Sequence, residues 1–221
     1  MRNRYEKQLE LLKEMLTETG ELCERAINQA MLALSSCSDT IARDVILADA
    51  HIDQMERDIE HLCLKLLLQQ QPVAGDLRQV SAALKMITDM ERIGDQAADI
   101  AEIVKSADMS LVRGFPKIQQ MATSAAAMVR DAVSSFALSD LALATATQAA
   151  DDAVDLLFDE VSNELIDFIV HADARDAQKA IDVIMIAKYL ERIGDHATNI
   201  AEWVDFSITG VHDVNFDTKT V

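Results

Sequence analysis

Apolar residues recur at three- and four-residue steps along most of the chain, which is the period of an amphipathic α-helix. Near the N-terminus the apolar positions are Leu9, Leu12, Met15, Leu16, Leu22, Cys23, Ala26, Ala30 and Ala33. Glycine and proline, which most often interrupt helices, number only 6 and 2 in the 221 residues. Gly20 is expected to weaken the first helix only locally. The pattern therefore predicts an all-α protein.

Breaks in this pattern divide the chain into six long helices. The first break, SSCSDT, offers Asp39 or Thr40 as a helix cap. The dipeptide Gln71-Pro72 ends the second helix, and Pro116 stands at a first helical position after the segment DMSLVRGFP. The expected helices span about residues 4–36, 39–70, 75–107, 116–138, 140–171 and 175–207. Residues 208–221 lose the helical period and are expected to form a tail.

A duplicated stretch sets the domain organisation. Residues 84–104 read LKMITDMERIGDQAADIAEIV and residues 184–204 read IMIAKYLERIGDHATNIAEWV, so ERIGD recurs at a spacing of 100 residues. Each copy falls on the third helix of a set of three. We therefore expect two tandem, pseudo-symmetric three-helix bundles, at residues 1–110 and 115–207, which pack together because the connection between them is short.

The duplicated helix carries an acidic stripe opposite its apolar face. At about 100° per residue, four carboxylates of the first copy fall within about 80° of one another: Glu91, Asp95, Asp99 and Glu102. The second copy has Glu191, Asp195 and Glu202, with Asn199 where Asp99 stands in the first.

This stripe and its glycine both weaken an isolated helix. Like charges four residues apart cost about 0.2–0.5 kcal/mol per pair, and a mid-helix glycine, Gly94 or Gly194, is about 1 kcal/mol worse than alanine. Both features make sense if a neighbouring backbone packs close at the glycine and a cation neutralises the acids. The alternative is an ordinary solvated polar face.

The middle helix of each set carries acids of its own. Asp49, Asp53, Glu56 and Glu60 share one stripe in the first set, and Asp151, Asp155 and Asp159 follow at four-residue steps in the second. If the middle and third helices are antiparallel neighbours, their stripes face one another. Clustered carboxylates suit hard cations such as Mg²⁺, Ca²⁺ and Mn²⁺, and also iron.

Basic side chains bear on both sites. Lys188 lies three residues before Glu191 and partly neutralises the second site, whereas Thr88 holds the corresponding position in the first copy. Arg92 and Arg192 follow the motif glutamates. Each arginine either pairs with another helix or is solvated.

Catalytic signatures are missing from the sequence. A carboxylate-bridged di-iron bundle needs Glu-x-x-His, and none of the 5 histidines has a glutamate three residues before it. His51 and His196 neighbour the stripes but are more simply explained as solvated or hydrogen-bonded. No GxSxG, P-loop or dinucleotide fingerprint occurs either.

The formal net charge of −18, with both halves acidic, disfavours nucleic acid and anionic membrane surfaces as partners and favours metal cations or basic protein surfaces. The N-terminus lacks the apolar region of a signal peptide, and no apolar run of 18 residues occurs, so a cytoplasmic location without membrane insertion is expected. Cys23, Cys37 and Cys63 form no CxxC pair and are expected to stay reduced.

The segments ERIGDQAADIAE and ERIGDHATNIAE, together with DAHID and DDAVD, closely resemble the PhoU family of phosphate-uptake regulators, over essentially the whole chain to about Phe206. The resemblance implies two similar three-helix bundles whose acidic motifs bind divalent or trivalent metal ions: iron, Mn, Mg, Ca or Zn. The implied ligands are Asp49, Asp53, Glu91, Asp95, Asp99, Asp151, Asp155, Glu191, Asp195 and Asn199. Because an amide adds no charge, Asn199 implies a weaker second site or one with fewer ions.

The resemblance also implies a role. PhoU-family proteins are similar in being cytoplasmic, non-enzymatic and often homodimeric adaptors between the Pst phosphate ABC transporter and the PhoR sensor histidine kinase, and they repress the phosphate-starvation response. The first hypothesis is therefore a metal-binding signalling adaptor that restrains a histidine kinase and modulates phosphate uptake. The alternatives are a metal-dependent hydrolase or oxidase that uses the same carboxylates, and a structural acidic bundle without metal.

Overall fold

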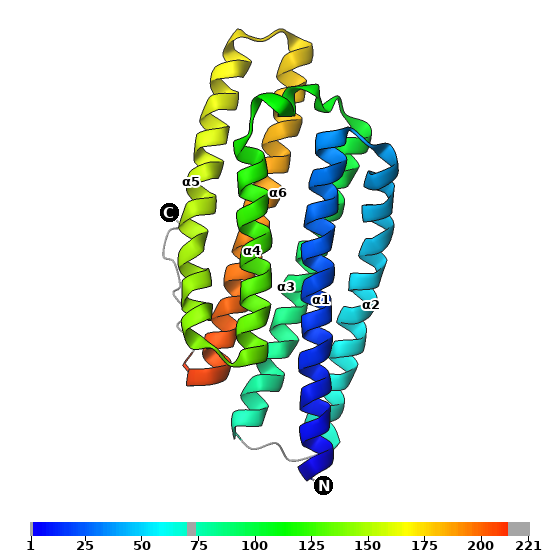
Figure 1. Ribbon diagram of the computed structural model, residues 1–221, viewed down its shortest axis with the longest axis vertical. Coiled ribbons are helices and arrows are strands. Elements are labelled where there is room, and N and C mark those ends of the chain that lie inside the picture. The colour runs from blue at the N-terminus through cyan, green and yellow to red at the C-terminus, as the bar shows by residue number, and fades with distance from the viewer. Residues whose placement is uncertain (1, 70–73, 212–221) are drawn as a thin grey trace, which may run out of the picture.

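The computed structural model describes residues 2–69 and 74–211, and the described residues are helical almost throughout, with no strand (Figure 1). The elements are α1 (Arg2–Ser36), α2 (Asp39–Gln69), α3 (Ala74–Ser106), a 3-10 helix η1 (Met109–Gly114), α4 (Lys117–Leu138), α5 (Leu141–His171) and α6 (Ala174–Thr209). The all-α prediction is confirmed, and every expected helix is present. The segment predicted as the boundary between the halves contains η1.

The helix ends follow local capping chemistry. Asp140 begins α5 by accepting a hydrogen bond from the Leu143 backbone N–H at 3.0 Å, as its predicted position requires. At the start of α2, however, the side chain that accepts such a bond is Ser38, whose Oγ lies 3.4 Å from the Ile41 nitrogen. The expected caps Asp39 and Thr40 are instead the first residues of the helix.

The end of α6 differs from the prediction by two residues. The helix continues to Thr209, whereas the sequence pattern places its end at Ser207. Gly210 stops it, because its φ of 77° lies in the left-handed region and its N–H donates to the Phe206 carbonyl at 2.9 Å. Most of the predicted tail, residues 212–221, lies outside the described residues.

The six α-helices form two sets of three that share one core. α3 and α6 pack against each other at the centre, α2 flanks α3, and α5 flanks α6. α1 packs against α3, α4 packs against α6, and α1 and α4 also contact each other. In Figure 1 both lie in front of the central pair. This arrangement leaves the opposite side of α2, α3, α6 and α5 without a covering helix among the described residues.

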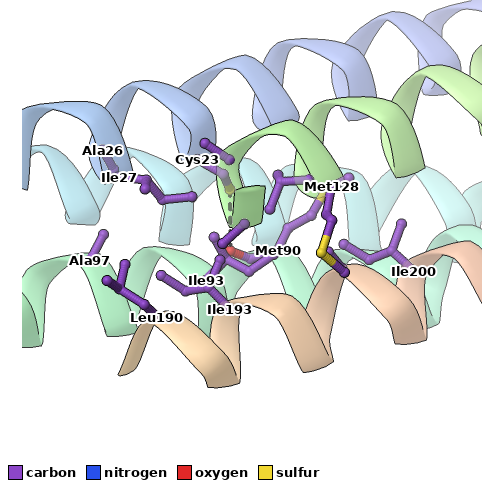
Figure 2. Close-up of a cluster of buried hydrophobic side chains, with 14 of the residues drawn as sticks. Cys23, Ala26, Ile27, Met90, Ile93, Ala97, Met128, Leu190, Ile193 and Ile200 are labelled. Carbon is purple, nitrogen blue, oxygen red and sulfur yellow. Dashed lines mark hydrogen bonds between the residues drawn. The ribbon is translucent and has the colours of Figure 1, made fainter. Parts of the chain in front are cut away.

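Side chains from both sets meet in this core. Figure 2 shows Cys23 and Ile27 of α1 beside Met90 and Ile93 of α3, with Ile193 of α6 nearby. All five are buried. Burial of each large aliphatic side chain contributes about 1.5–3 kcal/mol to folding, so the two halves stabilise each other.

Candidate metal centre

Asp49 of α2 lies directly against Gly94 of α3. A Cβ atom placed on Gly94 would lie 2.6 Å from Asp49 Oδ1 and 2.9 Å from Ile52 Cδ1. The sequence pattern predicts a neighbouring backbone at this glycine, and that detail is wrong, because the close neighbour is a side chain. Gly94 therefore makes room for the carboxylate itself.

The first acidic cluster surrounds Asp49. Burial raises the pKa of Asp49 to about 6, and the charges of Asp53, Asp95, Glu91 and Asp99 add to the rise. The Oδ1 atom is buried and accepts no hydrogen bond from any described residue. The charges of the other four predicted ligands of the first half therefore act on Asp49, and one of its buried oxygens has no donor among the described residues.

The second cluster repeats this plan. Asp151, Asp155 and Asp195 each offer one oxygen atom, and these three atoms lie within 4.8 Å of one another. Burial raises the pKa of Asp151 to about 6, with Asp155 and Asp195 adding to it. Its Oδ1 is also buried and lies 3.1 Å from a Cβ placed on Gly194, and a hydrogen bond from the Thr198 side chain to Asp151 opposes the rise in pKa.

Basic side chains occupy the two clusters differently. Arg92 lies on the exposed side of the first cluster, with its guanidinium 3.1 Å from Asp95 and 3.4 Å from Glu91. It thus pairs with acids of its own helix, whereas the sequence pattern offered only pairing with another helix or solvation. In the second cluster Lys188 Nζ lies 2.6 and 2.5 Å from the two carboxylate oxygens of Glu191.

Positions 99 and 199 contact the opposite half of the molecule. The Tyr189 hydroxyl of α6 hydrogen-bonds to Asp99, although burial keeps the pKa of Asp99 above its usual value. The Asn199 amide donates to Asp89 Oδ1 of α3 at 3.2 Å. His196 Nδ1 lies 2.9 Å from the same oxygen, so His196 is hydrogen-bonded, as predicted. A helical wheel of one copy cannot show these contacts, because they depend on how α3 packs against α6.

The clusters have the donor chemistry of a site for hard cations. Their ligand atoms are carboxylate oxygens, which Mg²⁺, Ca²⁺, Mn²⁺ and iron accept. Asp49 and Asp151 each hold a partly desolvated oxygen against a glycine and among like charges, and that of Asp49 has no donor among the described residues. A cation would relieve the repulsion in both clusters and satisfy the Asp49 oxygen. The residues present therefore fit a metal ion.

Sulfur does not belong to these sites. The buried Cys23 donates a hydrogen bond from its thiol to the Met90 carbonyl at 3.3 Å, and burial raises the pKa of Cys23 to about 12. Burial likewise raises the pKa of Cys63 to about 12. Both cysteines behave as small core residues, as predicted.

The chain is all-helical and has two related halves, and each half bears an acidic cluster between its second and third helices. These features place it in the class of duplicated helical-bundle proteins. The family model described as the PhoU domain matches this chain twice, over residues 16–104 and 118–204. The chain belongs to the PhoU family.

Named relatives agree with this assignment. The chain is 34% identical to the phosphate-specific transport system accessory protein PhoU homolog of Pseudomonas putida, over 93% of this chain and 81% of the relative. It is 36% identical to the corresponding homolog of Aquifex aeolicus, over 84% of each. These relatives are named as accessory proteins and not as enzymes, which confirms the non-enzymatic prediction.

Solved structures give the same result. The crystal structure of PhoU from Pseudomonas aeruginosa superposes with a TM-score of 0.86 at 32% identity, and covers 94% of this chain and 100% of its own. The phosphate transport system regulatory protein PhoU from Streptococcus pneumoniae also gives a TM-score of 0.86, at 26% identity, with 94% and 98% coverage. None of the described helices combines the length and the apolar character needed to cross a bilayer.

Proposed function

We propose that this chain is a cytoplasmic, metal-binding adaptor that represses the phosphate-starvation response and modulates phosphate transport through a Pst-type transporter and a PhoR-type sensor histidine kinase. One observation carries the metal-binding part: in each half a carboxylate oxygen, on Asp49 or Asp151, is buried among other carboxylates. The names of the relatives support the role in phosphate transport.

The bound cation would supply positive charge between paired helices and no redox or hydrolytic step. Asp49 and Asp53 would hold it from α2, and Glu91, Asp95 and Asp99 from α3; Asp151, Asp155, Glu191, Asp195 and Asn199 are the corresponding residues of the second half. Carboxylates that repel one another in the metal-free chain would then link the two helices. This fixes the relation of α2 to α3, and of α5 to α6, on the side that no other described helix covers.

The experiment that tests metal binding compares metal content and thermal midpoint before and after EDTA. Protein purified without chelator should contain metal, and EDTA should lower its midpoint, because a ligand that binds only the folded state stabilises that state by about 2.7 kcal/mol at 100 times its Kd. D95N should reduce both effects. D167N, which changes an exposed acid outside the clusters, is the matched control.

The outcome against metal binding is equally clear. If Mn²⁺, Fe²⁺ and Mg²⁺ neither bind nor raise the thermal midpoint of the EDTA-treated protein, the acids form a solvated face. The protein is then a structural acidic bundle without metal.

The signalling role needs its own measurement. Deleting the gene should raise expression of phosphate-starvation genes in rich phosphate, and the wild-type copy should restore repression. Unchanged expression would remove the regulatory part of the proposal. The homodimer implied by the resemblance is part of the proposal too, and light scattering of the purified chain measures it.

A further inference from the structure

A pseudo-two-fold axis relates the two halves of the chain. Asp99 of α3 accepts a hydrogen bond from the Tyr189 hydroxyl of α6, and the Asn199 amide of α6 donates to Asp89 of α3 at 3.2 Å. Positions 89 and 189 are equivalent in the duplication, and so are positions 99 and 199. Each contact therefore has its counterpart with the halves exchanged, which is the signature of a two-fold relationship. Because α3 packs against α6 and α1 against α4, the axis passes between both pairs of helices.

The axis emerges at the centre of the side formed by α2, α3, α6 and α5, which we call the open face because no described helix covers it. In Figure 1 this face points away from the viewer, behind α1 and α4. One acidic cluster lies on each side of the axis. A molecule that binds across the open face therefore meets the same set of groups twice.

Exposed aliphatic side chains recur at equivalent positions of the two halves. Leu64 of α2 and Ile166 of α5 are 45% and 53% exposed, and Leu68 and Val170, one turn further along the same helices, are 85% and 72% exposed. The step along the chain that separates the members of each pair is the step that separates the equivalent acids of α2 and α5. Exposed leucines are ordinary when they are scattered singly. Their recurrence at equivalent positions indicates a shared role for these side chains.

The helical geometry places these side chains on the open face. At about 100° per residue, Leu64 lies within about 20° of Asp53 around α2, and Ile166 lies within about 20° of Asp155 around α5. The second residue of each pair lies about 40° further round, still on the outward side of its helix. The aliphatic pairs thus continue the acidic stripes towards the ends of α2 and α5.

Each pair has an exposed neighbour on the adjoining helix. Leu77 near the start of α3 and Ile181 near the start of α6 are exposed, and they lie within about 40° of the acids at positions 95 and 195 around their helices. The first patch is Leu64, Leu68 and Leu77, and the second patch is Ile166, Val170 and Ile181. The patches lie at opposite ends of the molecule, because α2 ends and α3 begins at the lower end in Figure 1, whereas α5 ends and α6 begins at the upper end. The open face thus carries two acidic clusters between two apolar patches.

Charge decides which partner this face accepts. A second copy of this chain on the open face would place acidic clusters against acidic clusters, and the formal net charge of −18 opposes this contact. A protein that presents basic side chains between two apolar surfaces matches both the charge and the order of the groups. If that protein is itself two-fold symmetric, each of its subunits meets one patch and one cluster with the same residues.

We propose that the open face binds one homodimeric protein partner across the pseudo-two-fold axis, so that each partner subunit covers one apolar patch and sets basic side chains against the neighbouring acidic cluster. One chain then engages two partner subunits, and the two linked contacts bind more tightly than either contact alone. The inference rests on the adaptor role proposed above, and it adds the binding face, the symmetry of the partner and the stoichiometry.

The first test measures stoichiometry with the two partners proposed above. The full-length sensor histidine kinase and the whole phosphate transporter of the same organism are purified in detergent and titrated separately with the full chain. Sedimentation velocity gives the ratio of chain to partner in each complex, which should be one chain per kinase dimer or per transporter. A ratio of two chains with every partner that binds would overturn the inference and leave the adaptor role intact. Failure of the chain to bind either partner would overturn the adaptor role, and this inference with it.

The second test removes one patch at a time. L64D/L68D and I166D/V170D should each weaken binding by similar factors, roughly tenfold to a hundredfold, and the four substitutions together should abolish it. L32D/L138D is the matched control, because Leu32 of α1 and Leu138 of α4 are 47% and 72% exposed in the other helix layer. Circular dichroism checks that each variant is folded. Patch variants that bind as tightly as the control, or a loss confined to one patch, would contradict the inference.

Salt gives a third measurement that needs no substitution. The affinity should fall several-fold between about 0.05 and 0.5 M NaCl, because salt screens contacts between exposed acidic and basic side chains. An affinity that stays constant or rises over this range would overturn the proposed basic surface of the partner.

Discussion

The Asp49 carboxylate fills the space that a side chain at Gly94 would occupy, since a Cβ on that glycine would lie 2.6 Å from Asp49 Oδ1. The equivalent distance between Gly194 and Asp151 Oδ1 is 3.1 Å. Glycine in a helix interior is unfavourable, so its presence here reflects the close approach of the acid. The difference between the two distances makes the glycine substitutions unequal.

G94A should destabilise the chain by up to about 2 kcal/mol, because overpacking costs about 1–3 kcal/mol and the better helix propensity of alanine returns only about 1 kcal/mol. G194A should change the free energy of unfolding by less, since its contacts at 3.1 and 3.5 Å need only a small shift of Asp151 and Val154. Urea denaturation of both variants in EDTA measures the difference.

The control for helix propensity is G75A, because a Cβ on Gly75 would meet nothing within 4 Å. Its free energy of unfolding should stay level or rise slightly. If G94A were as stable as G75A, the close approach of Asp49 to Gly94 would not affect the free energy of unfolding.

The raised pKa values of Asp49 and Asp151 predict how the metal-free protein responds to acid. Each pKa is about 6 in the folded chain and about 3.9 in an unfolded one, so the folded state binds more protons between these values. Stability in EDTA should therefore increase as pH falls from about 6 towards 4, by roughly 1 kcal/mol for each residue after allowance for solvent screening.

Thermal midpoints in EDTA between pH 7.5 and 4.5 would show this rise, and the variant D49N/D151N should flatten it, because an amide does not titrate. Metal should reverse the trend, since protons compete with cations for the carboxylates. A metal-free midpoint that falls steadily on acidification would show that Asp49 and Asp151 keep ordinary pKa values in the folded chain.

The helices and their acidic stripes were predictable because both depend on periodicity within one helix. The apolar period determines which face is buried, and the four-residue spacing places Glu91 next to Asp95 whatever surrounds them. The approach of Asp49 to Gly94 was predictable only in part: the glycine indicated a close neighbour but not that the neighbour was a side chain.

Features that depend on two helices at once were not predictable. Pairing Lys188 with Phe158 requires the register of α5 on α6, which no single-helix pattern gives. Asn199 falls on the acidic stripe of the wheel, yet its amide donates to Asp89 of the other half. Its assignment as a metal ligand therefore remains a prediction, and the structure adds a competing role for this side chain.

The contact between Asp89 and His196 is predicted to stabilise the interface between the two halves. Both side chains are mostly buried, and their atoms lie 2.9 Å apart across α3 and α6. H196A should lower the free energy of unfolding by about 1–3 kcal/mol, since it removes one of the two described donors of a largely desolvated carboxylate.

H51A, at an exposed histidine of α2, should leave stability nearly unchanged and serves as the control. H196Q should recover part of the loss, because glutamine keeps a donor and is the residue at the equivalent position 96. Equal stabilities for H196A and H51A in chemical denaturation would show that Asn199 or water satisfies Asp89 equally well.

Gly20 marks a close approach between α1 and α4. A Cβ on Gly20 would lie 2.9 Å from both γ-methyl carbons of Val133, so G20A should destabilise the chain by up to about 2 kcal/mol after the gain in helix propensity. In a V133A background the clash is relieved, and the same substitution should cost about 0.5–3 kcal/mol less. V129A, which truncates a buried valine one turn earlier on α4, should leave the cost of G20A unchanged. Urea denaturation of this double-mutant cycle thus measures a direct contact between the two halves. If the effects of G20A and V133A on the free energy of unfolding were strictly additive, the strain of G20A would lie within α1 alone.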